Sequence, residues 1–172
     1  MKNLAMKNNF RLDIPDSAFD NFVWQIQNLT IPGVSLEIAP IVNGPKYAKI
    51  ANNHVAGSAT SYDDLTITFI VDEELLTYKE LLSWMLTMNN PTGGSEFEGK
   101  IPATMLLHIL DNNKDKIMAS FKFINPFPKS IGDIEWTYTE QGDVDAITCD
   151  VTFEYSYFDM LMDGKTLVGP VA

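Results

Sequence analysis

Cysteine, histidine and basic side chains are scarce in this sequence, and each shortage excludes a class of function. Among 172 residues there is one cysteine, Cys149, which excludes an internal disulfide framework and a thiolate metal cluster. The histidines, His54 and His108, have no partner at the spacing of a transition-metal site. Twelve Lys and Arg against 23 Asp and Glu give a net charge of −11, which disfavours tight direct binding to nucleic acid.

Long apolar runs and catalytic motifs are missing as well. No stretch approaches the roughly 18 consecutive apolar residues of a membrane span, and the polar residues 1–11 do not resemble a secretory signal peptide. The sequence has no G-x-S-x-G elbow, no phosphate-binding loop after Gly93-Gly94 and no EF-hand loop at 111–115. We expect a protein without enzymatic activity, metal or cofactor, and a small β-barrel enzyme stays as a distant alternative.

The apolar pattern predicts a mainly β chain with one helix. Alternating apolar residues, many of them β-branched or aromatic, predict about eight strands. They lie at 10–14, 22–26, 36–38, 65–71, 105–110, 117–123, 134–138 and 146–157. Leucines at three- and four-residue spacing predict one helix over 75–86, with Asp72, Glu73 and Glu74 at its amino end. We expect a single domain over 1–172, an antiparallel β-sandwich or barrel, with 1–9 and 159–172 as peripheral extensions.

Residues 42–61 form the longest stretch without a sustained apolar pattern. Twenty such residues are long for a connection inside a compact domain, and stretches of this kind are usually functional or disordered. We predict a long loop or half of an extended hairpin arm, which would gain stability only by pairing outside its own subunit. The candidate contact residues are Lys46, Tyr47, Lys49, Ile50, Asn52 and His54.

The last predicted strand has one apolar face and one polar face. The apolar face holds Ile147, Cys149, Val151, Phe153, Tyr155 and Tyr157, so we expect Cys149 to be a small buried core residue. The polar face holds Thr148, Asp150, Thr152, Glu154 and Ser156. Two interpretations fit this pattern. The polar residues either form an ordinary solvent face of a sandwich or line an aqueous channel shared among several copies of the chain.

Two segments resemble the tail tube proteins of T4-type contractile phages. In the first, 55–68 followed by Asp72-Glu73, the matching residues are Gly57, Asp63, Asp64 and Thr66. In the second, 127–136, they are Pro128, Gly132 and Trp136. The order of strands, long loop, strand, helix and strands is similar over roughly 10–158.

The resemblance implies a structural virion protein that self-assembles into hexameric rings, whose strands close into one ring-shaped barrel. Stacked rings would form the inner tail tube, assembled in the host cytoplasm, and DNA would pass through without specific binding. The implied partners are the tail sheath, the baseplate tube-initiator and the tail terminator. On this hypothesis Thr148, Asp150, Thr152 and Glu154 line the lumen, where acidic groups repel DNA. A baseplate tube-initiator or a type VI secretion-like tube protein is the alternative.

Overall fold

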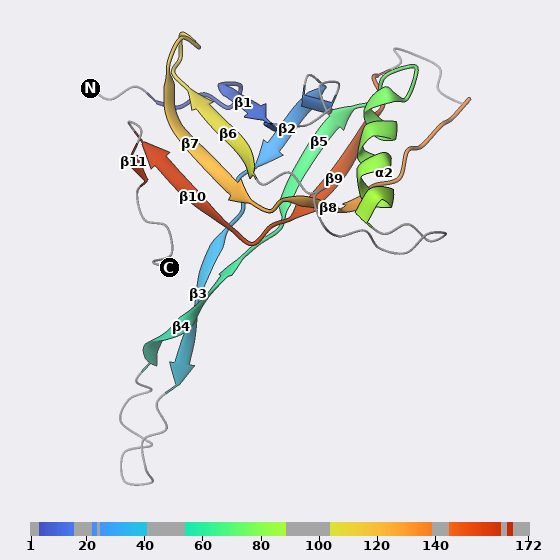
Figure 1. Ribbon diagram of the computed structural model, residues 1–172. Coiled ribbons are helices and arrows are strands. Elements are labelled where there is room, and N and C mark those ends of the chain that lie inside the picture. The colour runs from blue at the N-terminus through green and yellow to red at the C-terminus, as the bar shows by residue number, and fades with distance from the viewer. Residues whose placement is uncertain are drawn as a thin grey trace.

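The computed structural model describes residues 4–15, 22–23, 25–40, 54–88, 104–138, 145–162 and 165–166. Within these ranges the chain forms eleven strands and the helix α2 (Leu76–Met88). Two sheets lean against each other over a shared core, and a two-stranded ribbon projects away from them (Figure 1). No described helix is long and apolar enough to span a membrane. The mainly β class with antiparallel sheets and a helix, predicted from the sequence, is confirmed.

The first sheet contains five antiparallel strands. Their order is β1 (Phe10–Asp13), β6 (Thr104–Leu110), β7 (Ile117–Ile124), β10 (Tyr157–Met162) and β11 (Lys165–Thr166). The hairpin between β6 and β7 closes at residues 111–116. There the Asp111 carboxylate accepts hydrogen bonds from the backbone N–H groups of Asp115 and Lys116, at 2.8 and 3.2 Å.

The second sheet contains four antiparallel strands, and β2 and β8 are its edges. Their order is β2 (Ile26–Thr30), β5 (Leu65–Ile70), β9 (Thr148–Glu154) and β8 (Phe127–Ile131). Pro128 lies in β8, and an edge strand tolerates a residue without an N–H donor. The chain passes from the second sheet to the first between Glu154 and Tyr157, where β9 ends and β10 begins.

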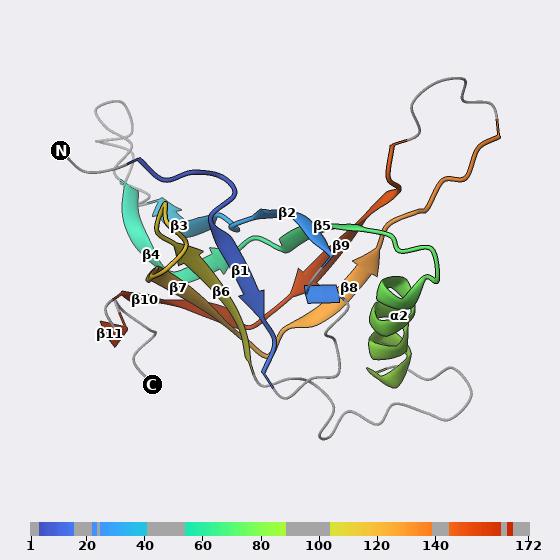
Figure 2. The same cartoon turned by 90° about the horizontal axis from the view of Figure 1, so that it is seen from above.

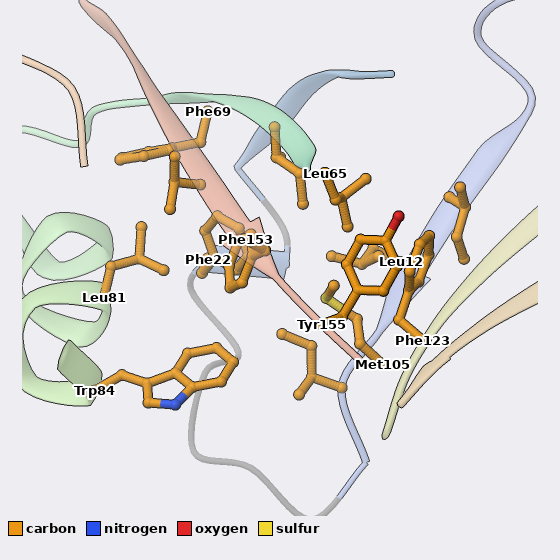
Figure 3. Packing of buried hydrophobic residues seen from close by; sticks show 14 of the residues in the cluster. Leu12, Phe22, Leu65, Phe69, Leu81, Trp84, Met105, Phe123, Phe153 and Tyr155 are labelled. Carbon is orange, nitrogen blue, oxygen red and sulfur yellow. The ribbon is translucent and has the colours of Figure 1, made fainter. Parts of the chain in front are cut away.

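The core lies between the inner faces of the two sheets and α2. Phe22 is fully buried, and its ring centroid lies 5.8 Å from that of Phe69 and 5.9 Å from that of Phe153. Trp84 of α2 reaches the same cluster, with its ring 5.6 Å from Phe153 (Figure 3). Cys149 is 3% exposed within this core, which confirms the expectation from its alternating pattern. Buried aromatic pairs of this kind contribute about 0.5–1.5 kcal/mol beyond their buried area.

Helix α2 begins one turn after a capping aspartate. The Asp72 carboxylate accepts hydrogen bonds from the backbone N–H groups of Leu76 and Thr77, at 2.8 and 2.9 Å. Burial tends to raise the pKa of Asp72, but the hydrogen bonds from Thr77 and Leu76 outweigh it and hold the pKa below its ordinary value. Leu75, just before the helix, has a left-handed φ of 56°. The acidic residues predicted at the amino end therefore act through one cap rather than from within the first turn.

The projecting ribbon is a hairpin that continues two strands of the second sheet. β3 (Val34–Pro40) follows β2 after a short bend, and β4 (His54–Tyr62) leads into β5 after another (Figure 1). At the bend the Asp63 N–H donates to the Gly33 carbonyl at 3.0 Å, so the hydrogen-bonded ribbon is continuous. We call β3 and β4 together the arm. Residues 31–33 form the bend between β2 and β3.

Several predicted elements are wrong in extent. The second strand begins at Ile26, and Phe22 lies in a helical turn that points its side chain into the core. Residues 54–61, for which the sequence left a loop or a hairpin arm open, belong to β4, which pairs with β3. The predicted strand 134–138 has no ladder partner in the described part of the chain, and β8 lies before it at 127–131.

The predicted closing strand is two strands in different sheets. β9 ends at Glu154, and β10 extends from Tyr157 to Met162, into residues expected to be a peripheral tail. The predicted alternation does not continue across the break. Tyr155 is buried, but in β10 it is Phe158 and not Tyr157 that packs against the core, so Tyr155 and Tyr157 do not share one face.

Candidate functional site

The four lumen candidates lie together on the outer face of the second sheet. Along β9 the side chains of Cys149, Val151 and Phe153 are buried, whereas those between them are exposed or half-buried. The outward side chains are those of Thr148, Asp150, Thr152 and Glu154. The structure therefore supports the predicted two-faced strand, since each polar candidate points away from the core.

Neighbouring strands extend this face with uncharged polar groups. Directly paired residues share a face of a sheet, so the register of the ladder defines the surface. Two rows of paired residues run across the sheet on this side, one through Asp150 and one through Thr152. Besides these two, the rows contain Asn28, Thr30, Thr66, Thr68 and Ser130. The sequence alone did not identify Asn28, Thr30 and Ser130, because the strand pairing that brings them beside β9 cannot be read from spacing. We call this surface the polar face.

Charge on the polar face is compensated in part. The Lys129 ammonium lies 2.8 Å from Glu154 and 2.9 Å from Asp64, and hydrogen bonds to these two carboxylates raise the pKa of Lys129. The Thr68 hydroxyl donates to the Asp150 carboxylate at 2.6 Å. We expected a face dominated by acidic repulsion, but hydroxyl and amide groups outnumber the carboxylates here and Glu154 is paired.

The base of the arm is fixed by a buried tyrosine. The Tyr155 hydroxyl donates to the backbone carbonyl of Asp63 at 2.6 Å, where the arm leaves the second sheet. Burial, followed by the nearby Asp63 and Asp64 carboxylates, raises the pKa of Tyr155 to about 12, so the phenol stays protonated and donating near neutral pH. Tyr155 also packs edge-on against Tyr62 of β4, with ring centroids 6.3 Å apart.

The arm itself exposes apolar side chains. Val34, Leu36 and Ile38 are 53%, 52% and 63% exposed along β3. Of the predicted arm contacts, His54 lies at the start of β4, and its side chain is not described. The others, Lys46, Tyr47, Lys49, Ile50 and Asn52, lie outside the described residues.

Two glycines of the resemblance lie where backbones approach closely. A Cβ on Gly57 would meet the Glu37 carbonyl oxygen at 2.5 Å, beside an irregularity in the β3–β4 ladder. A Cβ on Gly132 would lie 3.1 Å from the Asp150 carbonyl oxygen, which accepts a hydrogen bond from the Gly132 N–H at 2.7 Å. Both positions favour glycine for steric reasons.

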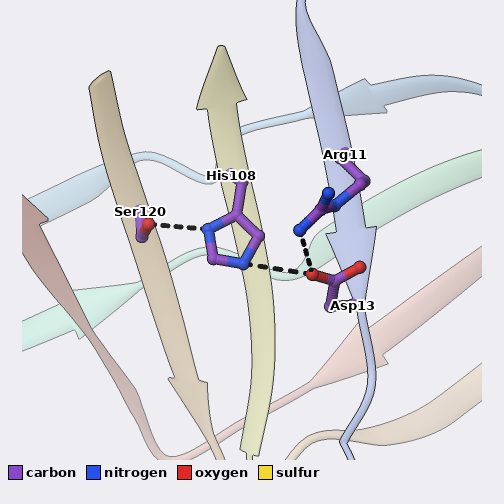
Figure 4. Close-up of polar contacts among 4 residues, drawn as sticks. All are labelled: Arg11, Asp13, His108 and Ser120. Carbon is purple, nitrogen blue, oxygen red and sulfur yellow. Dashed lines mark hydrogen bonds and ion pairs between the residues drawn. The ribbon is translucent and has the colours of Figure 1, made fainter. Parts of the chain in front are cut away.

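One polar cluster resembles a catalytic arrangement but lies on an outer sheet face. His108 Nδ1 is 2.7 Å from the Ser120 hydroxyl, and His108 Nε2 is 3.2 Å from the Asp13 carboxylate, which also binds Arg11 at 2.9 Å (Figure 4). Burial lowers the pKa of His108 more than Asp13 raises it. In a neutral ring with its proton on Nε2, Nε2–H donates to Asp13 and Nδ1 accepts from the Ser120 hydroxyl. These contacts link the side chains of β1, β6 and β7.

The single cysteine has the surroundings of a structural residue rather than a reactive one. The Cys149 thiol donates to the Gly132 carbonyl at 3.3 Å, and burial, followed by Asp150, raises its pKa, so the thiolate is disfavoured. Among the described residues, no group of three or more His, Cys, Asp and Glu side chains is placed to hold a metal ion.

Comparison with known proteins identifies the family. A family model described as phage tail tube protein matches residues 5–161. The chain belongs to the phage tail tube protein family. A tail tube terminator protein of Enterobacteria phage T4 is 35% identical to this family member over 167 residues, covering 96% of this chain and 93% of that protein.

Solved structures show the same fold at low sequence identity. The tube-terminating cap of the anti-feeding prophage has a TM-score of 0.67 and 10% identity, over 94% of this chain and 93% of that chain. A sheath/tube terminator of the PVC extracellular contractile injection system has a TM-score of 0.64 and 13% identity, over 93% and 98%. This tail tube family member is a structural component of a phage tail and not an enzyme.

Proposed function

We propose that this chain forms the ring that terminates the tube of a contractile phage tail. The observation that carries the proposal is the 35% identity, along 96% of this chain, to the tail tube terminator of phage T4. This role differs from the tube body implied by the sequence resemblance. The tube body is the second candidate, because the matching family model is described as a tail tube protein.

The topology of the second sheet suits closure into a ring. Its four strands alternate in direction, so the two edges, β2 and β8, run in opposite directions. Rotation about a ring axis preserves strand direction, so β8 of one copy meets β2 of the next as an antiparallel pair. Six copies joined in this way would form one closed barrel and leave no edge of this sheet unpaired.

In such a ring the polar face would line the lumen. The core occupies the other side of the second sheet, so the outward rows of Asp150 and Thr152 are the ones free to face water. Hydroxyl groups and partly compensated carboxylates offer no array of basic groups to phosphates. DNA would therefore pass without being retained.

The arm is the proposed contact with a neighbouring subunit or an adjacent ring. Its exposed Val34, Leu36 and Ile38 gain stability only when another surface covers them, and full burial of one such side chain contributes about 1.5–3 kcal/mol. Serine at Leu36 and Ile38 is expected to weaken assembly, whereas serine at the similarly exposed Ile117 leaves it unchanged. Equal assembly of all three proteins would refute this role.

The proposed neighbours are the last ring of the tube body and the end of the sheath, with assembly in the host cytoplasm.

A lumen role for the polar face is tested by substituting lysine for Asp150 and Glu154, with lysine at the exposed turn residue Asp115 as control. The first pair should retain DNA and slow genome delivery. Unchanged delivery by tails that contain the variant ring would rule out the lumen assignment.

Electron microscopy of the purified protein separates terminator from tube body. Isolated six-fold rings that do not stack, even at high concentration, are expected for a terminator. Long hollow tubes would favour the tube body instead. Compact monomers at every concentration, also in the presence of purified tubes, would contradict both roles. In the phage, loss of a terminator should leave tubes with irregular ends, whereas loss of the tube body should leave none.

A further inference from the structure

A second projection, formed by residues 132–138, exposes aromatic side chains. After β8 the chain leaves the second sheet and extends past α2, away from the body of the molecule (Figure 2). Trp136 is 65% exposed and Tyr138 is fully exposed, whereas Ile134 is half-buried at the root of the segment. Large aromatic side chains are enriched where proteins bind one another, and they often dominate the binding energy.

The charge of this projection has one sign. Asp133 and Glu135 are exposed beside the aromatic residues, and Asp145 is exposed where the chain returns towards β9. The sequence 130–148 contains no Lys or Arg. A surface that binds the projection should therefore combine apolar walls with basic groups.

Such a surface exists on the opposite edge of the same molecule. A groove of about 550 Å³ lies between β1 and β2, a volume that exceeds that of an indole side chain. Its apolar lining includes Phe10, Val23 and Ile26, and its basic groups are Lys7 and Arg11. Among the described residues, no acidic side chain lines this groove. Arg11 contacts Asp13 with one of its nitrogens, and its side chain remains 56% exposed.

The strand register shows that the projection and the groove lie at the same end of the second sheet. Ile26, the first residue of β2, pairs with Phe69 of β5, which pairs with Cys149 of β9. Gly132, where the chain leaves β8, hydrogen-bonds to Asp150, the next residue of β9. The start of β2 and the root of the projection therefore lie at the same end of the second sheet (Figure 1).

We propose that the aromatic projection of one copy docks in the groove between β1 and β2 of the next copy. If β8 pairs with β2 of the neighbour, Trp136 is carried towards the groove, and Glu135 faces Lys7 or Arg11. The inference rests on the proposed ring. It adds a side-chain contact that fixes which copy follows which, because the projection and the groove lie on opposite edges.

Disulfide trapping tests this contact. Cysteine replaces Trp136 and Lys7, which are exposed, while the native Cys149 is 3% exposed and protected from oxidation. Under mild oxidation the double variant should give a ladder of covalent oligomers up to the ring size. A mixture of the two single variants should give a dimer containing one of each.

Binding strength provides an independent readout. Alanine at Trp136 should weaken ring formation at least about tenfold, whereas alanine at Met118, exposed to 54% on the β6–β7 hairpin, should leave it unchanged. Lysine at Glu135 should also weaken the ring, and glutamate at Lys7 should restore it in the double variant.

The outcomes distinguish this contact from the ring itself. Normal rings by electron microscopy with no cross-link and no effect of the Trp136 change would overturn the docking contact alone. Cross-links only between two Trp136→Cys chains would replace it by a symmetric contact. Absence of rings from the unchanged protein would overturn the proposed function and this contact together.

Discussion

Removal of the Asp72 cap at the start of α2 tests how much this cap contributes to the free energy of unfolding. In the Asp72→Ala variant the backbone N–H groups of Leu76 and Thr77 lose a charged acceptor at 2.8 and 2.9 Å. Helix α2 carries Leu81 and Trp84, which are 0% and 2% exposed in the core. Fraying of the first turn therefore weakens the contact between the helix and the second sheet.

The expected loss is about 1–2 kcal/mol. A capping residue typically contributes about 0.5–2 kcal/mol. The upper half of that range applies because Asp72 serves two donors, and solvent access to the carboxylate limits the effect. For a chain of this size each kcal/mol shifts Tm by about 2–4 °C, so the variant should melt about 2–8 °C lower.

Thermal and urea unfolding followed by circular dichroism measure the difference, with alanine at the exposed Glu73 as control. The folded pKa of Asp72 is lowered, so its contribution is fully present above the unfolded value of about 3.9 and is lost as the pH falls through the folded pKa. The gap between wild type and variant should thus be constant from pH 7 to 5 and close in stronger acid. A gap below about 0.3 kcal/mol at pH 7, or one that persists in strong acid, would refute the cap as the cause.

Three further predictions concern the start of α2, the arm and His108. Leu75→Gly should leave stability unchanged or raise it by up to about 1 kcal/mol, since φ is 56° there, whereas Leu82→Gly, at a similarly exposed position inside the helix, should cost about 1 kcal/mol in thermal unfolding. Gly57→Val should cost about 1–3 kcal/mol of local stability, seen as faster amide exchange in the arm and not in the two sheets. Wild type should lose stability as the pH falls below about 6.5, because the pKa of His108 is lowered in the folded state and the unfolded chain binds the proton more readily. The His108→Gln variant should not show this loss. Parallel curves of stability against pH for the two proteins would contradict the prediction.

Sequence patterns located the elements that bury one face. The alternation in 65–71 corresponds to β5, and the leucine spacing over 75–86 corresponds to α2, because a buried stripe imposes its period on the sequence. Strand β4 carried no such signal. Its Ala56, Gly57 and Ser58 lie in a ribbon outside both sheets, so neither face is required to be apolar.

Other features depend on pairing that no local pattern encodes. Phe22 alternates with later apolar residues as a strand would, yet a helical turn carries its ring into the core. The sequence pattern predicted no strand at 127–131, which includes Pro128, but β8 lies at an edge, where the missing N–H costs no ladder bond to a further strand. Thr148, Asp150, Thr152 and Glu154 could be proposed as one face from their spacing. The partner of Glu154 is Lys129 of β8, which also binds Asp64, and this pairing could not be predicted from spacing along β9.

The construction of the arm has a consequence for how related tails can diverge. β3 and β4 are hydrogen-bonded to each other and, in the described part of the chain, to neither sheet. Adding one residue to each strand would lengthen the reach by about 3.3 Å and exchange the two faces, whereas adding two would lengthen it by about 6.6 Å and restore them. Insertions in pairs can therefore retune the spacing to a neighbouring component while the core stays untouched. Arm length is in this sense an adjustable dimension of the tail, and it can drift faster than the barrel that carries it.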